Sequence, residues 1–204
     1  NNVGLFGMVG ENATIRRLGV ENFTIDISTA KNLTVGGLAG ASYGNVENCY
    51  AKGVIKVTYT DTDTNIRTTV GGLIGGAYGG SVQMCYSHAD ISVSTGVANK
   101  LVVGGLVGSL SVYAVQCVAD GVIKVNMSSP IFAIGTVYGK IADGVGASNC
   151  FYSDRLKNSS SENVSANGVE KTAAQLSNGA FYTTLPMKWD KKVWNLDYAS
   201  GSLP

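Results

Sequence analysis

Four cysteines recur along the chain at nearly regular intervals, and they are its most reactive side chains. They are Cys49, Cys85, Cys117 and Cys150. Four thiols could form two disulfides or hold a zinc ion. They occupy the same place in a repeated unit, however, which indicates stacked, parallel side chains whose geometry favours neither a disulfide nor tetrahedral zinc. We therefore predict a ladder of free, buried cysteines, with disulfides as the alternative.

A polar loop carries oxygen-bearing side chains at alternate positions. Asp61, Asp63 and Asn65 could offer hard oxygen ligands to Ca²⁺. An EF-hand loop would have Gly at its sixth position and Glu at its twelfth, where this chain has Ile66 and Gly72. The match is only partial. A solvated loop is the simpler interpretation, and a calcium site is the alternative.

Aromatic side chains could bind carbohydrate, because the apolar face of a sugar ring stacks on an aromatic ring. Tyr43 and Tyr78 each lie five residues after the central leucine of a repeated Gly-Leu-x-Gly segment, so they could line one face. Trp189 and Trp194 lie close together near the C-terminus. All four are candidate ligand-binding residues. The alternative is that the tyrosines pack between neighbouring strands and the tryptophans cover the end of the domain.

Charged residues are few and scattered. The 204 residues include 15 Lys+Arg and 14 Asp+Glu, a net charge of +1, which gives no general attraction to nucleic acid or to anionic membranes. No pair of acids of the kind used in glycoside hydrolysis emerges. The single histidine, His88, lies three residues after Cys85 and would face another way on a strand. We therefore predict no catalytic residue, no cofactor and no enzyme activity.

A membrane span is also not expected. Residues 101–119 form an uncharged run close to the length that crosses a bilayer. Related segments elsewhere in the chain carry charges at corresponding places, so this run is interpreted as one copy of a repeat.

A repeated unit of 31 to 35 residues supplies the elements that must hold these side chains. Five copies contain a Val-Gly-Gly-Leu-x-Gly segment or a variant of it, with Leu38, Leu73 and Leu106 at the centre of the three clearest copies. A cysteine follows 11 to 13 residues later in four of them, and an alternating Ile-x-Val run comes after three of these cysteines. Such alternation predicts strands with one buried face. The leucines and cysteines are therefore predicted to form ladders in the core.

One unit of about three short strands could not bury its own apolar face, but stacked units could share a core. We therefore predict an all-β parallel β-helix or β-solenoid of about five coils, with a meander or sandwich as the alternative. Residues 1–152 would form the coils and residues 153–204 a small mixed cap. The chain begins almost on a strand, so further coils of the same polypeptide are expected upstream. The residues predicted to cover the open end are Phe181, Leu185, Trp189, Trp194 and Leu196.

The repeats resemble the GLUG motif, most clearly at residues 35–57, VGGLAGASYGNVENCYAKGVIKV. Residues 171–176, Trp189 and residues 193–195 resemble the segment that closes many GLUG arrays. The resemblance implies a bacterial surface or secreted protein, such as an adhesin-like protein or the non-catalytic part of an IgA-cleaving metallopeptidase. It supplies no catalytic residue.

The expected function is therefore that of a non-enzymatic extracellular module, acting in adhesion or as a structural stalk. Its partner would be a host or microbial surface protein or a glycan. A carbohydrate-binding module is the main alternative, and it predicts a row of exposed aromatic residues on one face. A polysaccharide-processing β-helix enzyme is a further alternative, and it predicts acids clustered in a cleft.

Overall fold

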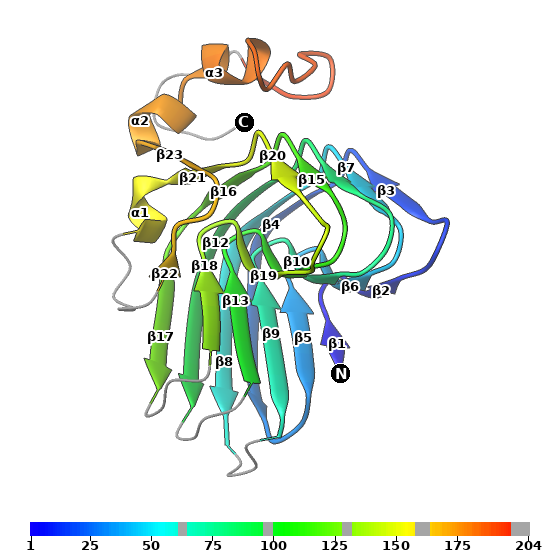
Figure 1. Ribbon diagram of the computed structural model, residues 1–204, viewed down its shortest axis with the longest axis vertical. Helices are drawn as coiled ribbons and strands as arrows, with labels where there is room; N and C mark the ends of the chain where they lie inside the picture. Colours follow the sequence, from blue (N-terminus) through cyan, green and yellow to red (C-terminus); the bar gives the residue numbers. More distant parts are fainter. Residues whose placement is uncertain (61–64, 96–99, 128–131, 158–163, 197–204) are drawn as a thin grey trace.

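The computed structural model describes residues 1–60, 65–95, 100–127, 132–157 and 164–196. Every strand pairing among these residues is parallel, and paired strands lie about one repeat apart in the sequence, except at the end of the chain, where Phe151 pairs with the closer Val169. This arrangement is a β-solenoid, because each strand pairs with its equivalents in the preceding and following coils. The predicted all-β parallel solenoid is confirmed (Figure 1).

The described strands form four sheets, which each complete coil visits in the order A, B, C and D, whereas the last coil has described strands only in sheets A and D. Sheet A contains β1 (Asn2–Val3), β5 (Leu33–Gly36), β9 (Arg67–Gly71), β13 (Lys100–Gly104), β18 (Phe132–Gly135) and β22 (Val164–Ser165). Sheet B contains β2 (Phe6–Val9), β6 (Ala39–Ser42), β10 (Ile74–Ala77), β14 (Val107–Leu110) and β19 (Tyr138–Ile141). Sheet C contains β3 (Thr14–Arg16), β7 (Asn45–Glu47), β11 (Val82–Gln83), β15 (Ala114–Val115) and β20 (Ala147–Ser148).

Sheet D holds the longest strands. It contains β4 (Gly19–Thr29), β8 (Tyr50–Tyr59), β12 (Tyr86–Thr95), β16 (Val118–Asp120), β21 (Phe151–Ser153) and β23 (Val169–Lys171), and β17 (Ile123–Met127) also pairs with β12. A coil thus has four strand segments where the sequence predicted about three. The difference arises because the Val-Gly-Gly-Leu-x-Gly segment bends and contributes a strand to sheet A and another to sheet B.

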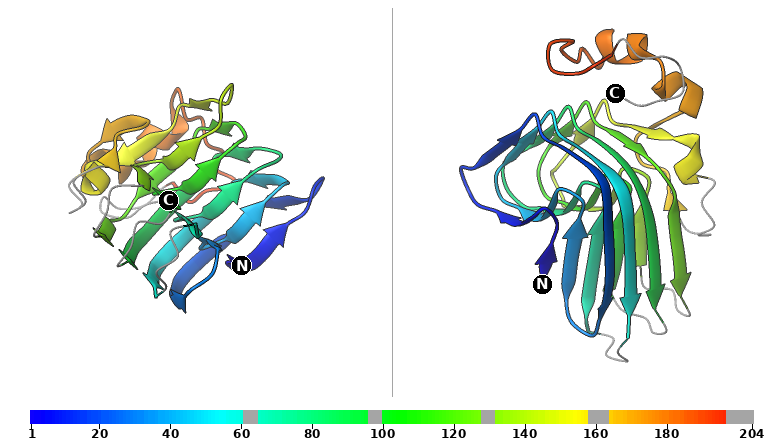
Figure 2. Two further views of the ribbon diagram at one scale, coloured as in Figure 1. Left: turned by 60° about the horizontal axis from the view of Figure 1, so that its bottom comes forward. Right: turned by 180° about the vertical axis from the view of Figure 1, so that it is seen from behind.

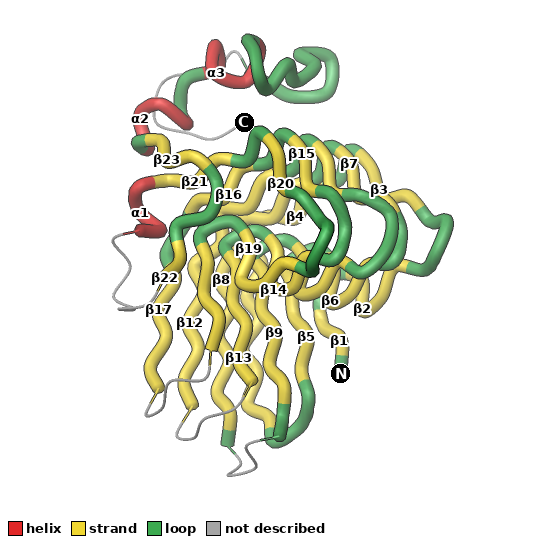
Figure 3. The backbone as a smooth tube through the Cα atoms, viewed as in Figure 1, coloured by secondary structure: helices red, strands yellow, loops and turns green. Residues whose placement is uncertain are grey.

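The coil is bent into two arms. In Figure 1, sheet A and the long strands of sheet D extend downwards together, and sheets B and C form the second arm to the right. The view from behind shows the strands of sheet D side by side (Figure 2). Figure 3 shows that the described helices lie only in the C-terminal part: α1 (Asp154–Lys157), α2 (Ala173–Leu176) and α3 (Gly179–Thr183).

Equivalent residues of successive coils form ladders in the interior. Val35, Val70 and Val103 pair in register along sheet A, and none exposes any surface. Leu38, Leu73 and Leu106 are also fully buried at the start of sheet B. Burial of one apolar ladder per strand is the main stabilising term that a solenoid gains from stacking.

The glycines of the repeated motif form the bend between sheets A and B. A Cβ atom on Gly75 would lie 2.5 Å from the carbonyl oxygen of Gly40 and 2.7 Å from the amide nitrogen of Val35. A Cβ atom on Gly108 would lie 2.5 Å from the carbonyl oxygen of Gly75. These approaches involve backbone atoms that cannot move aside easily, so only glycine fits. Glycine at positions 75 and 108 is therefore a steric requirement of the close approach between sheets A and B.

The C-terminal segment divides into two parts. In α1, Leu156 is fully buried and joins the main core at the last coil. The chain then adds β23 to sheet D, and residues 172–196, which we call the clasp, run back along the outside of the solenoid. Trp189 Nε1 donates to the carbonyl oxygen of Gln116 at 3.1 Å, and Trp194 Nε1 donates to Asn48 Oδ1 at 3.2 Å. The clasp thus covers the flank of the coils.

This position differs from the predicted cover over the open end. The clasp packs on the outward residues that follow the cysteines along sheet D, among them Tyr86, Val118 and Phe151. These side chains are apolar and in register, so they offer a long surface that the aromatic clasp buries. Leu185 does not take part in this packing, since 74% of its surface is exposed.

Candidate functional site

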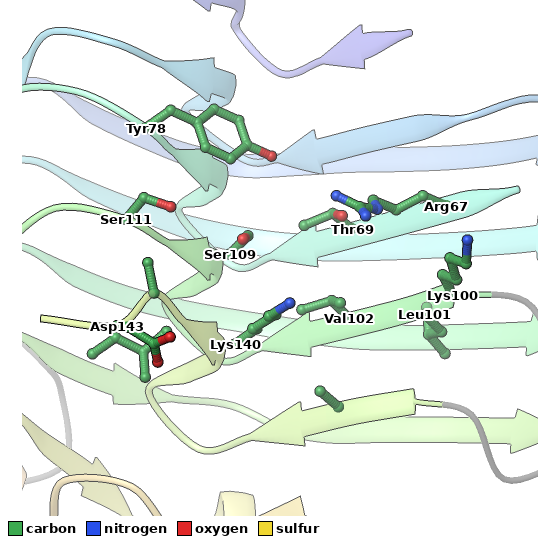
Figure 4. Close-up of a pocket in the computed structure, with 13 residues that line it drawn as sticks. Arg67, Thr69, Tyr78, Lys100, Leu101, Val102, Ser109, Ser111, Lys140 and Asp143 are labelled. Atoms are coloured by element: carbon green, nitrogen blue, oxygen red, sulfur yellow. The ribbon is translucent and has the colours of Figure 1, made fainter. Parts of the chain in front are cut away.

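A groove of about 590 Å³ lies on the solvent-facing, concave side of the bend between sheets A and B (Figure 4). We call it the corner groove. Its lining residues in or beside sheet A are Arg67, Thr69, Lys100, Leu101, Val102 and Ala133. Those in or beside sheet B are Tyr78, Ser109, Ser111, Lys140, Ile141, Ala142 and Asp143.

In-register pairing determines which side chains line the groove. Arg67 of β9 pairs with Lys100 of β13, so two cations stand on neighbouring strands. On sheet B, Ser109 of β14 pairs with Lys140 of β19. The amide of Arg67 also donates to Asn32 Oδ1 at 2.7 Å, which ties the start of β9 to the preceding coil.

The groove carries an excess of positive charge. Arg67, Lys100 and Lys140 are exposed, and none of them has an ion-pair partner among the described residues. Asp143 is the single carboxylate in the described lining. The whole chain has a net charge of only +1, so this excess is local. Cations without partners in a concave surface attract anions more strongly than isolated surface charges do.

Tyr43 and Tyr78 stand together at one end of the groove. Their ring centroids are 5.6 Å apart, the ring planes are inclined by 42°, and the residues are 39% and 36% exposed. A Cβ atom on Gly76 would lie 2.4 Å from Tyr78 Cζ, so the Tyr78 ring lies across a glycine. Burial and the nearby Tyr43 raise the pKa of Tyr78, while Arg67 acts in the opposite sense. The structure thus brings Tyr78 and Arg67 together.

Trp189 and Trp194, the other predicted aromatic pair, lie inside the clasp. Their rings stack with centroids 4.5 Å apart, and the residues are only 3% and 5% exposed. Beneath them Tyr50 and Tyr86 stack at 4.8 Å. Both indole N–H groups donate to the solenoid, so these residues serve packing and offer little surface to a ligand.

The four cysteines form a ladder at the corner between sheets C and D. All are free and buried. Each residue before a cysteine has a positive φ, for example 53° at Asn48 and 50° at Met84, which turns the chain sharply. Each thiol donates to the carbonyl oxygen two residues earlier, as in Cys85 Sγ to Gln83 O at 3.1 Å. The thiols thus partner buried carbonyls at the turn, and burial raises the pKa of Cys85.

The predicted calcium ligands cannot be placed as a set. Asp61 and Asp63 lie outside the described residues, and Asn65 is exposed. In the part of the chain that the structure describes, no group of three or more His, Cys, Asp or Glu side chains could hold a metal ion.

A charged cluster on sheet D is a feature that the sequence analysis missed. His88 Nδ1 lies 2.7 Å from Asp120 Oδ2, and Arg155 Nη1 lies 3.6 Å from the same oxygen. Burial acts to raise the pKa of Asp120, but hydrogen bonds from His88 and the Gly121 amide outweigh it and lower that pKa. His88 and Asp120 each lie three residues after a cysteine and pair in register, so their equal offset was the available signal. The cluster links two coils to α1.

The described lining of the corner groove has one carboxylate, Asp143, and no histidine or cysteine. Its other polar side chains are cations, serine and threonine hydroxyl groups and the Tyr78 phenol. Cations and hydroxyl groups can bind polar or charged groups of a ligand through hydrogen bonds.

Two of the repeats match a known family model. The model of the GLUG motif matches residues 31–58 and 67–92. A crystal structure from Bacteroides ovatus, described as a candidate immunoglobulin A1 protease, is similar with a TM-score of 0.45 and 16% identity, over 78% of this chain and 68% of that chain. No curated protein matches the chain.

The motif matches coincide with the coils. Residues 31–58 span β5 to β8, and residues 67–92 span β9 and most of the coil up to β12. No helix in the described residues is long and apolar enough to cross a membrane. The chain is therefore a β-solenoid that contains GLUG motifs, each of which builds one coil.

Proposed function

We propose that this chain is a non-enzymatic module of a bacterial cell-surface or secreted protein, and that it acts in adhesion by binding a partner along the corner groove. The observation that carries the proposal is the groove itself, which is concave and bears three cations without ion-pair partners among the described residues. The GLUG motif supports an extracellular bacterial role.

The solenoid suits this role physically. Its stacked coils share one core, so the outer side chains of successive coils are held at fixed spacing. A partner that contacts several coils at once gains affinity without paying to order a loop. The groove crosses from the coil of Tyr78 to the coil of Lys140, and it therefore offers an extended contact surface.

A glycan and host-protein binding array with the purified chain tests the proposal. We expect a reproducible ligand whose signal falls in the variant Tyr78→Ala and persists in Tyr113→Ala, a control at a tyrosine that is 61% exposed and does not line the groove. Binding that is the same in wild type and both variants would refute the groove as the binding surface. A parallel assay for cleavage of polysaccharides is expected to show no product.

Carbohydrate binding is the form of adhesion that a specific observation favours. Tyr43 and Tyr78 are exposed and adjacent, as a surface that stacks on sugar rings requires. The other aromatic pair is buried in the clasp, so the two tyrosines are the better candidates for such a platform.

A further inference from the structure

We infer that the corner groove binds an anionic polysaccharide, with sugar rings against Tyr78 and carboxylate or sulfate groups against Arg67, Lys100 and Lys140. This inference rests on the proposed function and adds the class of ligand. Two independent features of the groove support it: its three cations, which have no ion-pair partner in the described part of the chain, and its aromatic end (Figure 4).

The cations favour an acidic ligand over a neutral one. Arg67 and Lys100 stand side by side on sheet A, and Lys140 projects from sheet B on the other side of the groove. Neighbouring like charges repel each other when the groove is empty. An anion placed between them relieves this repulsion and accepts charge-assisted hydrogen bonds, which are stronger than those to neutral hydroxyl groups.

The order of the residues along the solenoid suits a linear polymer. Tyr78 belongs to the coil of β10, Ser109 to the coil of β14 and Lys140 to the coil of β19. Successive coils are about 4.8 Å apart, which is close to the length of one sugar ring. A polysaccharide that runs along the solenoid axis would thus meet Tyr78 and Arg67 in the first coil, Ser109 and Lys100 in the second, and Lys140 in the third.

Acidic peptides and nucleic acids fit less well. The groove strands β9, β10, β13 and β14 are hydrogen-bonded to a strand on both sides, so a peptide could not add as a strand along most of the groove. Of the described groove strands in sheet B, β19 lies at the sheet edge, and a peptide added there would extend the sheet beyond the groove. The chain has a net charge of only +1, which gives no long positive track for a nucleic-acid backbone.

Binding of four polymers to the intact chain tests the inference: polygalacturonate, chondroitin sulfate, dextran and polyglutamate. We expect binding to polygalacturonate, which carries carboxylates alone, or to chondroitin sulfate, which carries carboxylates and sulfates, and none to dextran or polyglutamate. Binding to chondroitin sulfate without binding to polygalacturonate would indicate that sulfate is required. The double variant Lys100→Ala/Lys140→Ala should bind about tenfold more weakly. High salt should also weaken binding.

The matched control is Lys124→Ala, which removes an exposed lysine from β17, outside the groove. It should bind like the wild type, and circular dichroism should show that every variant is folded. Equal binding to dextran or polyglutamate, or no effect of the double variant, would overturn the inference. If neither acidic polymer binds but an array ligand depends on Tyr78, the ligand class is wrong and the proposed function stands. If no array ligand depends on Tyr78, the proposed function itself fails.

Discussion

The corner between sheets C and D and the corner between sheets A and B are alike inside the coil, where each repeats one small residue type. They differ on the outside, where the first corner is covered and the second is open. Inside, one small residue type recurs: cysteine at the first corner and glycine at the second. Outside, the cysteine corner carries a continuous apolar ladder that the clasp buries. The glycine corner carries residues that change from coil to coil, and it stays open as the corner groove.

The difference separates residues that specify the fold from residues that could specify a ligand. At the cysteine corner, the outward position is Tyr50, Tyr86, Val118 and Phe151 in successive coils, and all of them suit packing. At the glycine corner, the outward position on sheet B is Gly76, Ser109 and Lys140. A ladder whose side chains stay suited to packing in every coil supports stacking. A ladder whose side chains differ in size and charge from coil to coil gives each part of the surface its own binding properties.

Loss of a clasp tryptophan should have the largest effect on stability. Trp189 is 3% exposed and contacts Tyr86, Tyr182 and Trp194. We expect Trp189→Ala to lower the free energy of unfolding by about 4 kcal/mol, because a large buried ring is removed. Urea unfolding followed by circular dichroism measures this. A loss below about 1 kcal/mol would show that packing of the clasp on the corner between sheets C and D contributes little to stability.

Substitution in the glycine corner should be nearly as damaging. In Gly75→Ala, the new Cβ atom would meet backbone atoms of Gly40 and Val35 at 2.5 and 2.7 Å, so the bend must open. We expect a loss of about 3 kcal/mol in urea unfolding. Gly10→Ala is the matched control, since a Cβ atom there has nothing within 4 Å. Equal stability of the two variants would contradict the steric account of the bend.

The charged cluster beside the clasp predicts a pH-dependent contribution to stability. Since the pKa of Asp120 is lowered in the folded protein, its carboxylate stabilises the fold fully above the ordinary value of 3.8 and loses this contribution as the pH falls through the lower folded value. Asp120→Asn should therefore cost about 2 kcal/mol at neutral pH and progressively less in acid.

Urea unfolding at a series of pH values measures this difference, and Asp90→Asn, at an exposed acid of β12, is the control. A cost for Asp120→Asn that is independent of pH would show that the His88–Asp120 contact contributes through packing alone.

A single cysteine should contribute least. Cys85→Ala removes the donor to Gln83 O and should lower the free energy of unfolding by about 1 kcal/mol. In the wild type, a thiol-alkylating reagent should leave all four buried cysteines unmodified until the chain is denatured, as mass spectrometry can show. Loss of all four thiols without reductant would instead indicate disulfides and contradict the free ladder.

The interior was predictable because local sterics repeat with the sequence. The Gly-Gly-Leu-x-Gly segments and the cysteine spacing gave the coil length, and Leu38, Leu73 and Leu106 are buried where alternation placed inward side chains. The extra strand in each coil was missed because the double glycine marks a bend whose angle comes from backbone packing between coils.

The outer surface was less predictable because the side chains that meet on it depend on the angle of the bend between sheets A and B. Tyr43 and Tyr78 share an offset and do meet, yet nothing local indicates that Arg67 and Lys100 of sheet A lie across the bend from Tyr78. The clasp was predicted to cover the open end of the solenoid. The apolar character of its residues shows that they are buried, but it does not show whether they pack on the end of the solenoid or along its side. His88 and Asp120, in contrast, could have been paired from their equal distance to the preceding cysteine.

Hydroxyl-radical footprinting with saturating polygalacturonate tests most directly whether the open corner is the binding surface. Mass spectrometry then reports the oxidation of each tyrosine with and without the polymer. We predict protection of Tyr43 and Tyr78 and unchanged oxidation of Tyr113, which is 61% exposed outside the groove. Protection of Tyr113 with no change at Tyr78 would contradict the account.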